Sequence, residues 1–180
     1  MKFLALAGFY NCLFLYLEPI STLTPFLFIH LYPGGAAWFH SELIPPVGGV
    51  GSSKLALLDS RTEMAIWQLG NCYILLAMIS SLVFRAIRDA LPDNPVAQER
   101  IVGAALLAYA IADVTHIVAS WISLPDSLQL SPLSWNATTH GNITVVVFLF
   151  AVRLAWFAGI GRTRYWYGQT SDTSRISKKA

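Results

Sequence analysis

Four long runs of apolar residues divide the chain, and polar or proline-rich stretches separate them. The runs cover residues 3–31, 64–84, 101–124 and 142–161. A helix needs about 20 mostly apolar residues to cross the hydrocarbon core of a bilayer. Each run reaches or approaches that length, so the pattern predicts an all-α fold, a four-helix transmembrane bundle. The connection at residues 32–61 is rich in Pro, Gly and Ser and predicts a loop.

Composition supports a membrane location. Of the 180 residues, 55% are hydrophobic and 12% are charged, whereas a soluble domain carries about a quarter charged residues. The length allows one domain, residues 1–161, followed by a basic cytosolic tail over residues 162–180. A net charge of +2 is too small to indicate a nucleic-acid partner. This composition predicts that membrane lipid surrounds the protein and is its partner.

Basic residues predict the orientation in the membrane. With four spans, both termini and the second loop lie on one side, where Lys and Arg are concentrated. The basic residues of that side are Lys2, Arg85, Arg88, Arg100, Arg162, Arg164, Arg175, Lys178 and Lys179. The other side holds only Lys54 and Arg61, so the termini are expected in the cytosol. The end, residues 177–180, resembles a dilysine retrieval signal out of register and favours the endoplasmic reticulum.

Three charged residues lie near the middle of predicted spans: Glu18, Asp113 and Arg153. A charge at the centre of a membrane helix costs about 2.5–3.5 kcal/mol on insertion scales. We therefore expect these side chains to face the interior of the bundle, where they pair or are neutral.

Helical spacing groups other polar residues with these charges, because positions three, four, seven or eleven apart share a helix face. The groups are Tyr109, Asp113, His116 and Ser120; Asn11, Glu18 and Ser21; Gln68 and Asn71; and Asn142 and Arg153. The spacing predicts that every span contributes polar side chains to one interior.

Two interpretations of this interior remain open. Polar side chains often hydrogen-bond between membrane helices, and Asp113 with Arg153 can form a buried ion pair. Alternatively, two carboxyls with one arginine leave an acid without a full partner, which can keep its proton in a dry pocket. A protonated carboxyl beside an ionised one is a general acid and base pair.

The acid–base interpretation assigns candidate roles. The candidate catalytic residues are Glu18, Asp113, His116 and Arg153. The candidate substrate contacts are Asn11, Asn71, Tyr109, Trp135 and Asn142. Asp113 and His116 could touch one ion, but no second such pair follows, and there is no phosphate-binding glycine loop. We therefore expect no metal and no cofactor.

Several short motifs resemble one family of small fungal membrane proteins. They are residues 15–21 (LYLEPIS), 68–73 (QLGNCY), 112–116 (ADVTH), 135–136 (WN), 141–142 (GN) and 152–153 (VR). The family includes the membrane-bound terpene cyclase of ascofuranone biosynthesis and the epoxide hydrolases of citreoviridin- and aurovertin-type polyketide pathways. His140 departs from the aromatic residue expected before Gly-Asn.

The resemblance implies epoxide opening, by water or by an internal hydroxyl, in secondary metabolism. It assigns acid–base roles to Glu18 and Asp113, with His116 and Arg153 in support. The expected partner is a lipophilic small molecule, a polyketide or meroterpenoid epoxide; other pathway enzymes are a further possibility. The alternatives are a lipid- or sterol-binding or scaffold protein without catalysis, and a sterol-isomerase-like enzyme that protonates an alkene.

Overall fold

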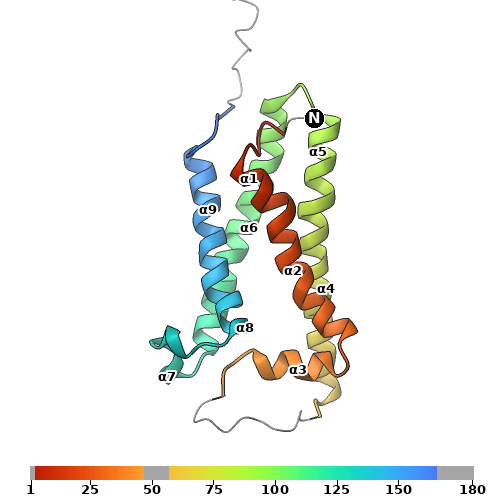
Figure 1. The fold of residues 1–180 in the computed structure, drawn as a ribbon, viewed down its shortest axis with the longest axis vertical. Helices are drawn as coiled ribbons and strands as arrows, with labels where there is room; N and C mark the ends of the chain where they lie inside the picture. The colour runs from red at the N-terminus through yellow and green to blue at the C-terminus, as the bar shows by residue number, and fades with distance from the viewer. Residues whose placement is uncertain (1–2, 47–56, 166–180) are drawn as a thin grey trace, which may run out of the picture.

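The structure is a computed structural model that describes residues 3–46 and 57–165. Four helical rods run side by side along its length (Figure 1). Each is long and apolar enough to cross a membrane, which confirms the predicted four-helix transmembrane bundle. The rods are Phe9–Leu31, Ser60–Ala90, Pro95–Ser123 and Ala137–Ala158.

Three of the four rods contain a π-helical turn. The first rod joins α1 (Phe9–Cys12), η1 (Leu13–Leu17) and α2 (Glu18–Leu31). The second joins α4 (Ser60–Met78), η2 (Ile79–Val83) and α5 (Phe84–Ala90), and the third is α6 (Pro95–Ser123). The fourth joins α8 (Ala137–His140), η4 (Gly141–Val145) and α9 (Val146–Ala158). The π-helical segments are η1, η2 and η4, and such turns are frequent at functional sites.

The first rod begins at Phe9 rather than at Phe3 as predicted. Residues 3–8 form no helix, and Gly8 has a φ of 59°, which favours glycine. The segment packs between α6 and α9, where Gln98 Oε1 accepts a hydrogen bond from the Ala5 amide (3.3 Å) and Trp156 Nε1 donates one to the Ala5 carbonyl (2.9 Å). The backbone groups of Ala5 are thus satisfied by side chains instead of by helical hydrogen bonds.

The connections are also more ordered than the expected loops. The segment predicted as a loop at residues 32–61 contains the helix α3 (Gly35–Glu42), and the third connection contains α7 (Asp126–Gln129) and the 3-10 turn η3 (Pro132–Ser134). Gly35 allows α3 to turn back against α2, since a Cβ there would lie 2.0 Å from the Phe28 carbonyl oxygen. The prolines and glycines around α3 therefore mark its ends rather than the absence of a helix.

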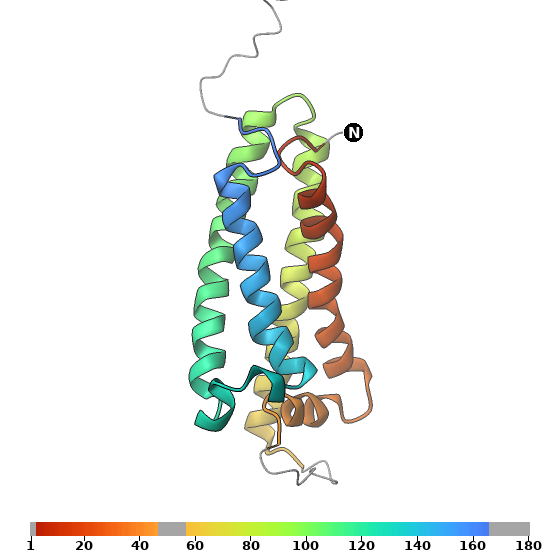
Figure 2. The same ribbon diagram turned by 60° about the vertical axis from the view of Figure 1, so that its left-hand side comes forward.

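Both ends of the described chain lie at the same end of the bundle, together with the connection from α5 to α6 (Figures 1 and 2). α3 and α7 lie at the opposite end. We call the end of the bundle that holds both ends of the described chain the terminal end. The shared side of the two ends follows from an even number of spans; which compartment it faces stays a prediction.

The rods pack as two pairs, α2 along α4 and α6 along α9. Near the terminal end the pairs meet in one apolar core, which includes Leu6, Phe14, Phe84, Leu106 and Trp156. Towards α3 the two pairs part (Figure 1). The core holds the pairs together above a hollow, and this hollow contains the polar residues.

Candidate active site

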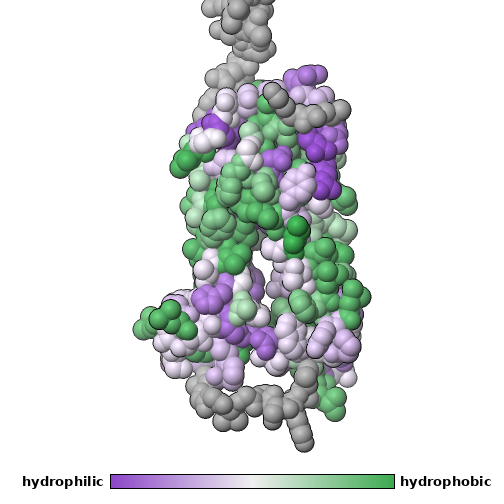
Figure 3. All heavy atoms as spheres, in the orientation of Figure 1, coloured by the Kyte–Doolittle hydropathy of each residue, from purple (hydrophilic) through white to green (hydrophobic). Residues whose placement is uncertain are grey.

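A cavity of about 820 Å³ lies between the two helix pairs. Its lining residues come from α2, α3, α4, α6, α8, η4 and α9, so all four rods contribute. The space-filling view shows an opening between the halves of the molecule at this level (Figure 3). A volume of this size lies within the usual range of small-molecule sites.

Three charged side chains from three rods meet in the cavity wall. Arg153 on α9 donates from Nη1 to Asp113 Oδ2 on α6 at 2.7 Å and from Nη2 to Glu18 Oε1 on α2 at 2.5 Å. Arg153 is 1% exposed, Glu18 6% and Asp113 9%. The arginine therefore bridges two buried carboxyls, and all three residues line the cavity. We call this cluster the triad.

Aromatic rings stabilise the arginine on its other sides. The guanidinium carbon lies 5.3 Å from the centre of the Tyr109 ring and 5.6 Å from that of Phe14, within the range of cation–π attraction. Ser80 of η2 contacts the Tyr109 hydroxyl at 3.3 Å, so the second rod also reaches the cluster. This surrounding fixes the guanidinium between the two carboxyls.

Two polar atoms of the triad are left without partners. Glu18 Oε2 and Arg153 Nε are buried, and neither has a hydrogen-bond partner within residues 3–46 and 57–165. A buried polar atom without a partner is costly, and such atoms are often found where a ligand binds or a reaction occurs. Glu18 Oε2 is the more informative of the two because a carboxyl oxygen can both bind and release a proton, whereas the arginine stays protonated.

The local sequence explains how Glu18 reaches this position. The π-helical turn η1 ends at Leu17, and Glu18 opens α2 within the same continuous rod. Pro19 comes next, and because it has no amide hydrogen, one carbonyl of the preceding turn receives no helical hydrogen bond from it. The Glu18 carbonyl accepts hydrogen bonds from the hydroxyls of Ser21 (2.7 Å) and Thr22 (3.1 Å). These bonds cover the polar groups of the first turn and hold its backbone in place.

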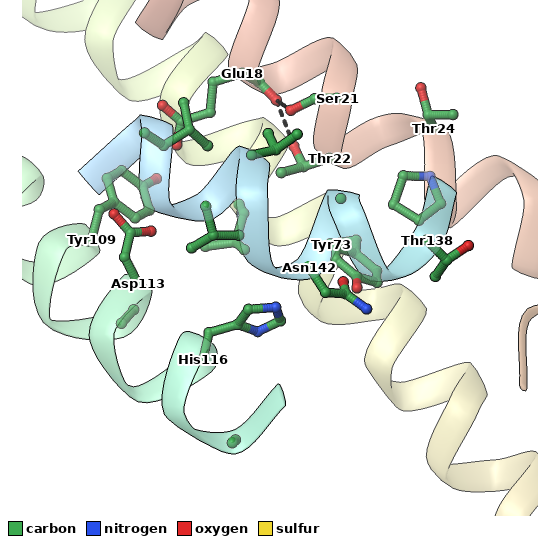
Figure 4. A pocket seen from close by; sticks show the side chains of 18 of the residues that line it. Glu18, Ser21, Thr22, Thr24, Tyr73, Tyr109, Asp113, His116, Thr138 and Asn142 are labelled. Atoms are coloured by element: carbon green, nitrogen blue, oxygen red, sulfur yellow. Dashed lines mark hydrogen bonds between the residues drawn. The ribbon is translucent and has the colours of Figure 1, made fainter. Parts of the chain in front are cut away.

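A second polar group lies in the cavity one turn further along α6. The imidazole of His116 points towards the Asn142 amide of η4, and both residues line the cavity (Figure 4). His116 follows Asp113 by three positions and so shares its helix face. The triad and this pair are thus two polar regions along one cavity.

The end of the cavity nearest α3 is aromatic. The rings of Phe28 and Trp38 lie 5.1 Å apart, and those of Phe39 and Tyr73 lie 6.1 Å apart; all four line the cavity. α3 is held there because Asn136 Nδ2 donates to the Glu42 carbonyl at 2.8 Å. The cavity therefore runs from charged residues at one end to aromatic rings at the other.

A family model described as a domain of unknown function, DUF7704, matches residues 3–163. The chain belongs to the DUF7704 family. No curated protein and no solved structure matches the chain. The matched range includes every residue of the triad, and the activity of this DUF7704 protein is argued below from its own geometry.

The structure gathers some of the candidate substrate contacts and separates others. Tyr109 and Asn142 line the cavity of this DUF7704 protein. Asn11, Asn71 and Trp135 do not.

The two asparagines and the tryptophan lie outside the cavity. Asn11 is half-buried and Asn71 is exposed. Trp135 instead donates from Nε1 to the Leu128 carbonyl at 2.8 Å. The second span therefore does not turn its Gln68–Asn71 face inward as predicted; both of those residues are exposed, and Tyr73 and Ser80 face the interior.

Sequence reasoning missed the aromatic end of the cavity. Trp38 and Phe39 lie on α3, in a stretch predicted as loop. The signal was the run Ala36-Ala37-Trp38-Phe39, which is too short for a span but suits a helix packed on the bundle. In the described part of the chain, no three His, Cys, Asp or Glu side chains are close enough to hold a metal ion.

Proposed function

We propose that this protein is a membrane-embedded acid–base catalyst that opens the epoxide of a lipophilic polyketide or meroterpenoid, as a hydrolase or a cyclase. The observation that carries the proposal is the triad: one arginine between two buried carboxyls in the wall of a cavity. The epoxide itself comes from the motif resemblance, and the acid–base chemistry comes from the charges.

The charge of the triad favours one bound proton. Two ionised carboxylates and one guanidinium sum to −1, and a net charge buried within the membrane is costly. One proton makes the cluster neutral. The cluster then holds one carboxylic acid and one carboxylate side by side, which are the two partners that general acid–base catalysis needs.

Burial and hydrogen bonding support Glu18 as the acid. Its side chain is 7% exposed against 11% for Asp113, and the more buried carboxyl keeps the proton because charging it costs more. Glu18 Oε2 also lacks a partner among the described residues. A proton on that oxygen makes no hydrogen bond to the described residues, so its transfer to a substrate breaks none.

The reaction then has a simple balance. The Glu18 carboxyl donates its proton to the epoxide oxygen as the C–O bond of the ring breaks. The oxygen of water or of a substrate hydroxyl forms the new C–O bond, and its proton passes to the Asp113 carboxylate. Water gives a vicinal diol and an internal hydroxyl gives a cyclic ether with an alcohol. Transfer of one proton from Asp113 back to Glu18 restores the triad.

The other polar region and the aromatic end supply positioning. His116 and Asn142 lie on the same cavity and offer hydrogen bonds to the attacking hydroxyl or to a second oxygen of the substrate. The rings of Phe28, Trp38 and Tyr73 suit a polyene or aromatic portion. Such a substrate dissolves in the bilayer and reaches the cavity through the opening between the helix pairs.

Location completes the proposal. We place the protein in the endoplasmic reticulum membrane with the terminal end in the cytosol. The basic residues Arg85, Arg88, Arg100 and Arg162 support this orientation.

Co-expression with flavin epoxidases that act on polyene or prenylated aromatic substrates tests the proposed reaction. The expected result is either the epoxide plus one molecule of water or an isomer of the epoxide, formed only when this protein is present. Isotopically labelled water distinguishes hydrolysis, which incorporates the label, from cyclisation, which does not. If the epoxide is retained by the protein but never converted, the ligand-binding alternative replaces this proposal.

A further inference from the structure

A second groove lies on the outer side of the first helix pair, away from the cavity. It encloses about 390 Å³ and shares no lining residue with the cavity. Residues of η1 and α2 form one wall, and residues of α4, η2 and α5 form the other. Its lining is apolar along most of its length, including Ile20, Leu23, Ile74 and Met78. Ile20 is 60% and Met78 41% exposed, so the groove opens towards lipid.

The charged group of the groove lies at the end nearest the terminal end of the bundle. The Arg85 guanidinium carbon lies 5.5 Å from the centre of the Tyr16 ring. The Ser81 hydroxyl, lower in the groove, already donates to the Ala77 carbonyl at 2.6 Å. Arg85 is thus the group in this groove that can bind a charged ligand.

Arg85 differs from neighbouring arginines in its partners. Arg88 pairs with Asp89 at 2.7 Å, and Arg162 pairs with Glu99 at 2.9 Å. The salt bridges formed between described residues do not include Arg85. Its charge therefore lies at the top of an apolar groove and makes no salt bridge among the described residues, although Asp89, one turn further along the helix and paired with Arg88, also attracts it.

The dimensions of the groove match one leaflet of a bilayer. Arg85 directly follows the apolar run 64–84, at the level where headgroups begin. Arg85 and Ile74 are eleven residues apart, about 16 Å of helix. That is about half of the ~30 Å hydrocarbon thickness, the depth that one acyl chain occupies.

We propose that this groove binds one anionic phospholipid, with its phosphate on Arg85 and one acyl chain between α2 and α4. A guanidinium matches the geometry of phosphate oxygens. A headgroup with a net negative charge is attracted to Arg85, whereas in phosphocholine the quaternary ammonium cancels the charge of the phosphate. The groove lies on the flank of α2 opposite the cavity, so this site is independent of the proposed reaction.

Native mass spectrometry of the full-length protein tests this site, with dioleoyl phosphatidylserine and dioleoyl phosphatidylcholine as probes. We expect one phosphatidylserine to be retained in preference to phosphatidylcholine. Arg85→Gln should weaken phosphatidylserine binding about fivefold, the effect of one basic residue near an anionic membrane surface. Arg88→Gln is the matched control, because Arg88 lies outside the groove. Both changes are made in an Asp89→Asn background, so that neither releases an acid beside the other arginine, and Arg88→Gln should bind as that background does.

A second variant tests the acyl-chain part of the groove without changing its charge. Ser81→Phe fills the space between the helices and should also lower phosphatidylserine retention. Equal retention of both lipids by the wild type would overturn the proposal. Equal loss in Arg85→Gln and Arg88→Gln would overturn it too, since the effect would then be one of surface charge alone.

Discussion

Arg153 is the residue whose removal should reveal the charge state of the triad. It is 1% exposed and donates to both buried carboxyls. Arg153→Met keeps an unbranched side chain of similar reach and removes the charge. The carboxyls of Glu18 and Asp113 then remain in the membrane interior with no cation between them.

The expected loss follows from the number of carboxylates stranded. Removal of one partner of a buried ion pair typically costs about 3–5 kcal/mol. Arg153 serves two carboxyls, but one of them already holds a proton in the neutral triad, so one carboxylate is stranded and the cost is not doubled. That carboxylate can also bind a proton instead of staying charged, which keeps the cost from exceeding this range. We therefore expect Arg153→Met to lower the free energy of unfolding by about 3–5 kcal/mol.

Reversible unfolding in mixed micelles with increasing dodecyl sulfate, followed by tryptophan fluorescence, measures this difference. A triple variant with Arg153→Met, Glu18→Gln and Asp113→Asn removes the stranded charge and should recover stability to within about 1 kcal/mol of the wild type, because neutral replacement of a whole buried ion cluster is often tolerated. If Arg153→Met alone were as stable as the wild type, the carboxyls would not be buried with the arginine as described, and the charge argument would fail.

Three further predictions concern the fold. Gly70→Ala should destabilise the protein by about 1–3 kcal/mol, since its Cβ would lie 2.2 Å from His30 Cε1. Gly141→Ala is the control: no atom from elsewhere in the fold lies within 4 Å of its Cβ, so it should be neutral or stabilising in the same unfolding assay. Equal effects of the two changes would contradict the α2–α4 packing. Hydrogen bonds, first from the Thr62 hydroxyl and then from backbone amides, lower the pKa of Asp59 below its usual range. The ionised Asp59 caps α4, so its contribution to stability is fully present above the usual carboxyl pKa and is lost as pH falls through the lowered pKa. Asp59→Ala should remove this acid dependence of stability, and an unchanged pH profile would count against the cap. A glycosylation reporter fused to the C-terminus should remain unmodified if that end is cytosolic, and modification would reverse the proposed orientation.

The spans and the meeting of the charges could be predicted from the sequence for two physical reasons. A run of about 20 apolar residues has few alternatives to a membrane helix, and a charge inside such a run must turn inward. Those two constraints identify the rods and bring Glu18, Asp113 and Arg153 together. Rotations of helices that contain strong charges are thus largely determined by the cost of exposing those charges to lipid.

Weakly polar residues carry no such constraint, which explains where prediction failed. An asparagine can face lipid or headgroups at modest cost, so the spacing of Gln68 and Asn71 does not determine the rotation of α4. That rotation instead follows from the close contact of Gly70 with His30. A contact between two helices cannot be read from the pattern of either one.

Prediction of the connections failed for a related reason. α3 is only eight residues long, and a helix of that length is stable only when packed against other elements. Its aromatic residues looked like part of a loop because their packing partners lie on α2 and α4. The N-terminal segment is similar, since Ala5 depends on Gln98 and Trp156 for its hydrogen bonds.

Turnover of a lipophilic epoxide by the purified protein tests the central claim most directly. The variants Glu18→Gln and Asp113→Asn keep the shape of each side chain and remove its titrating proton, and Glu63→Gln is the control because Glu63 is exposed and outside the cavity. We predict that each triad variant inserts normally and converts the epoxide at least about 100-fold more slowly than the wild type, while Glu63→Gln retains the wild-type rate. Wild-type turnover by both triad variants would contradict acid–base catalysis by Glu18 and Asp113.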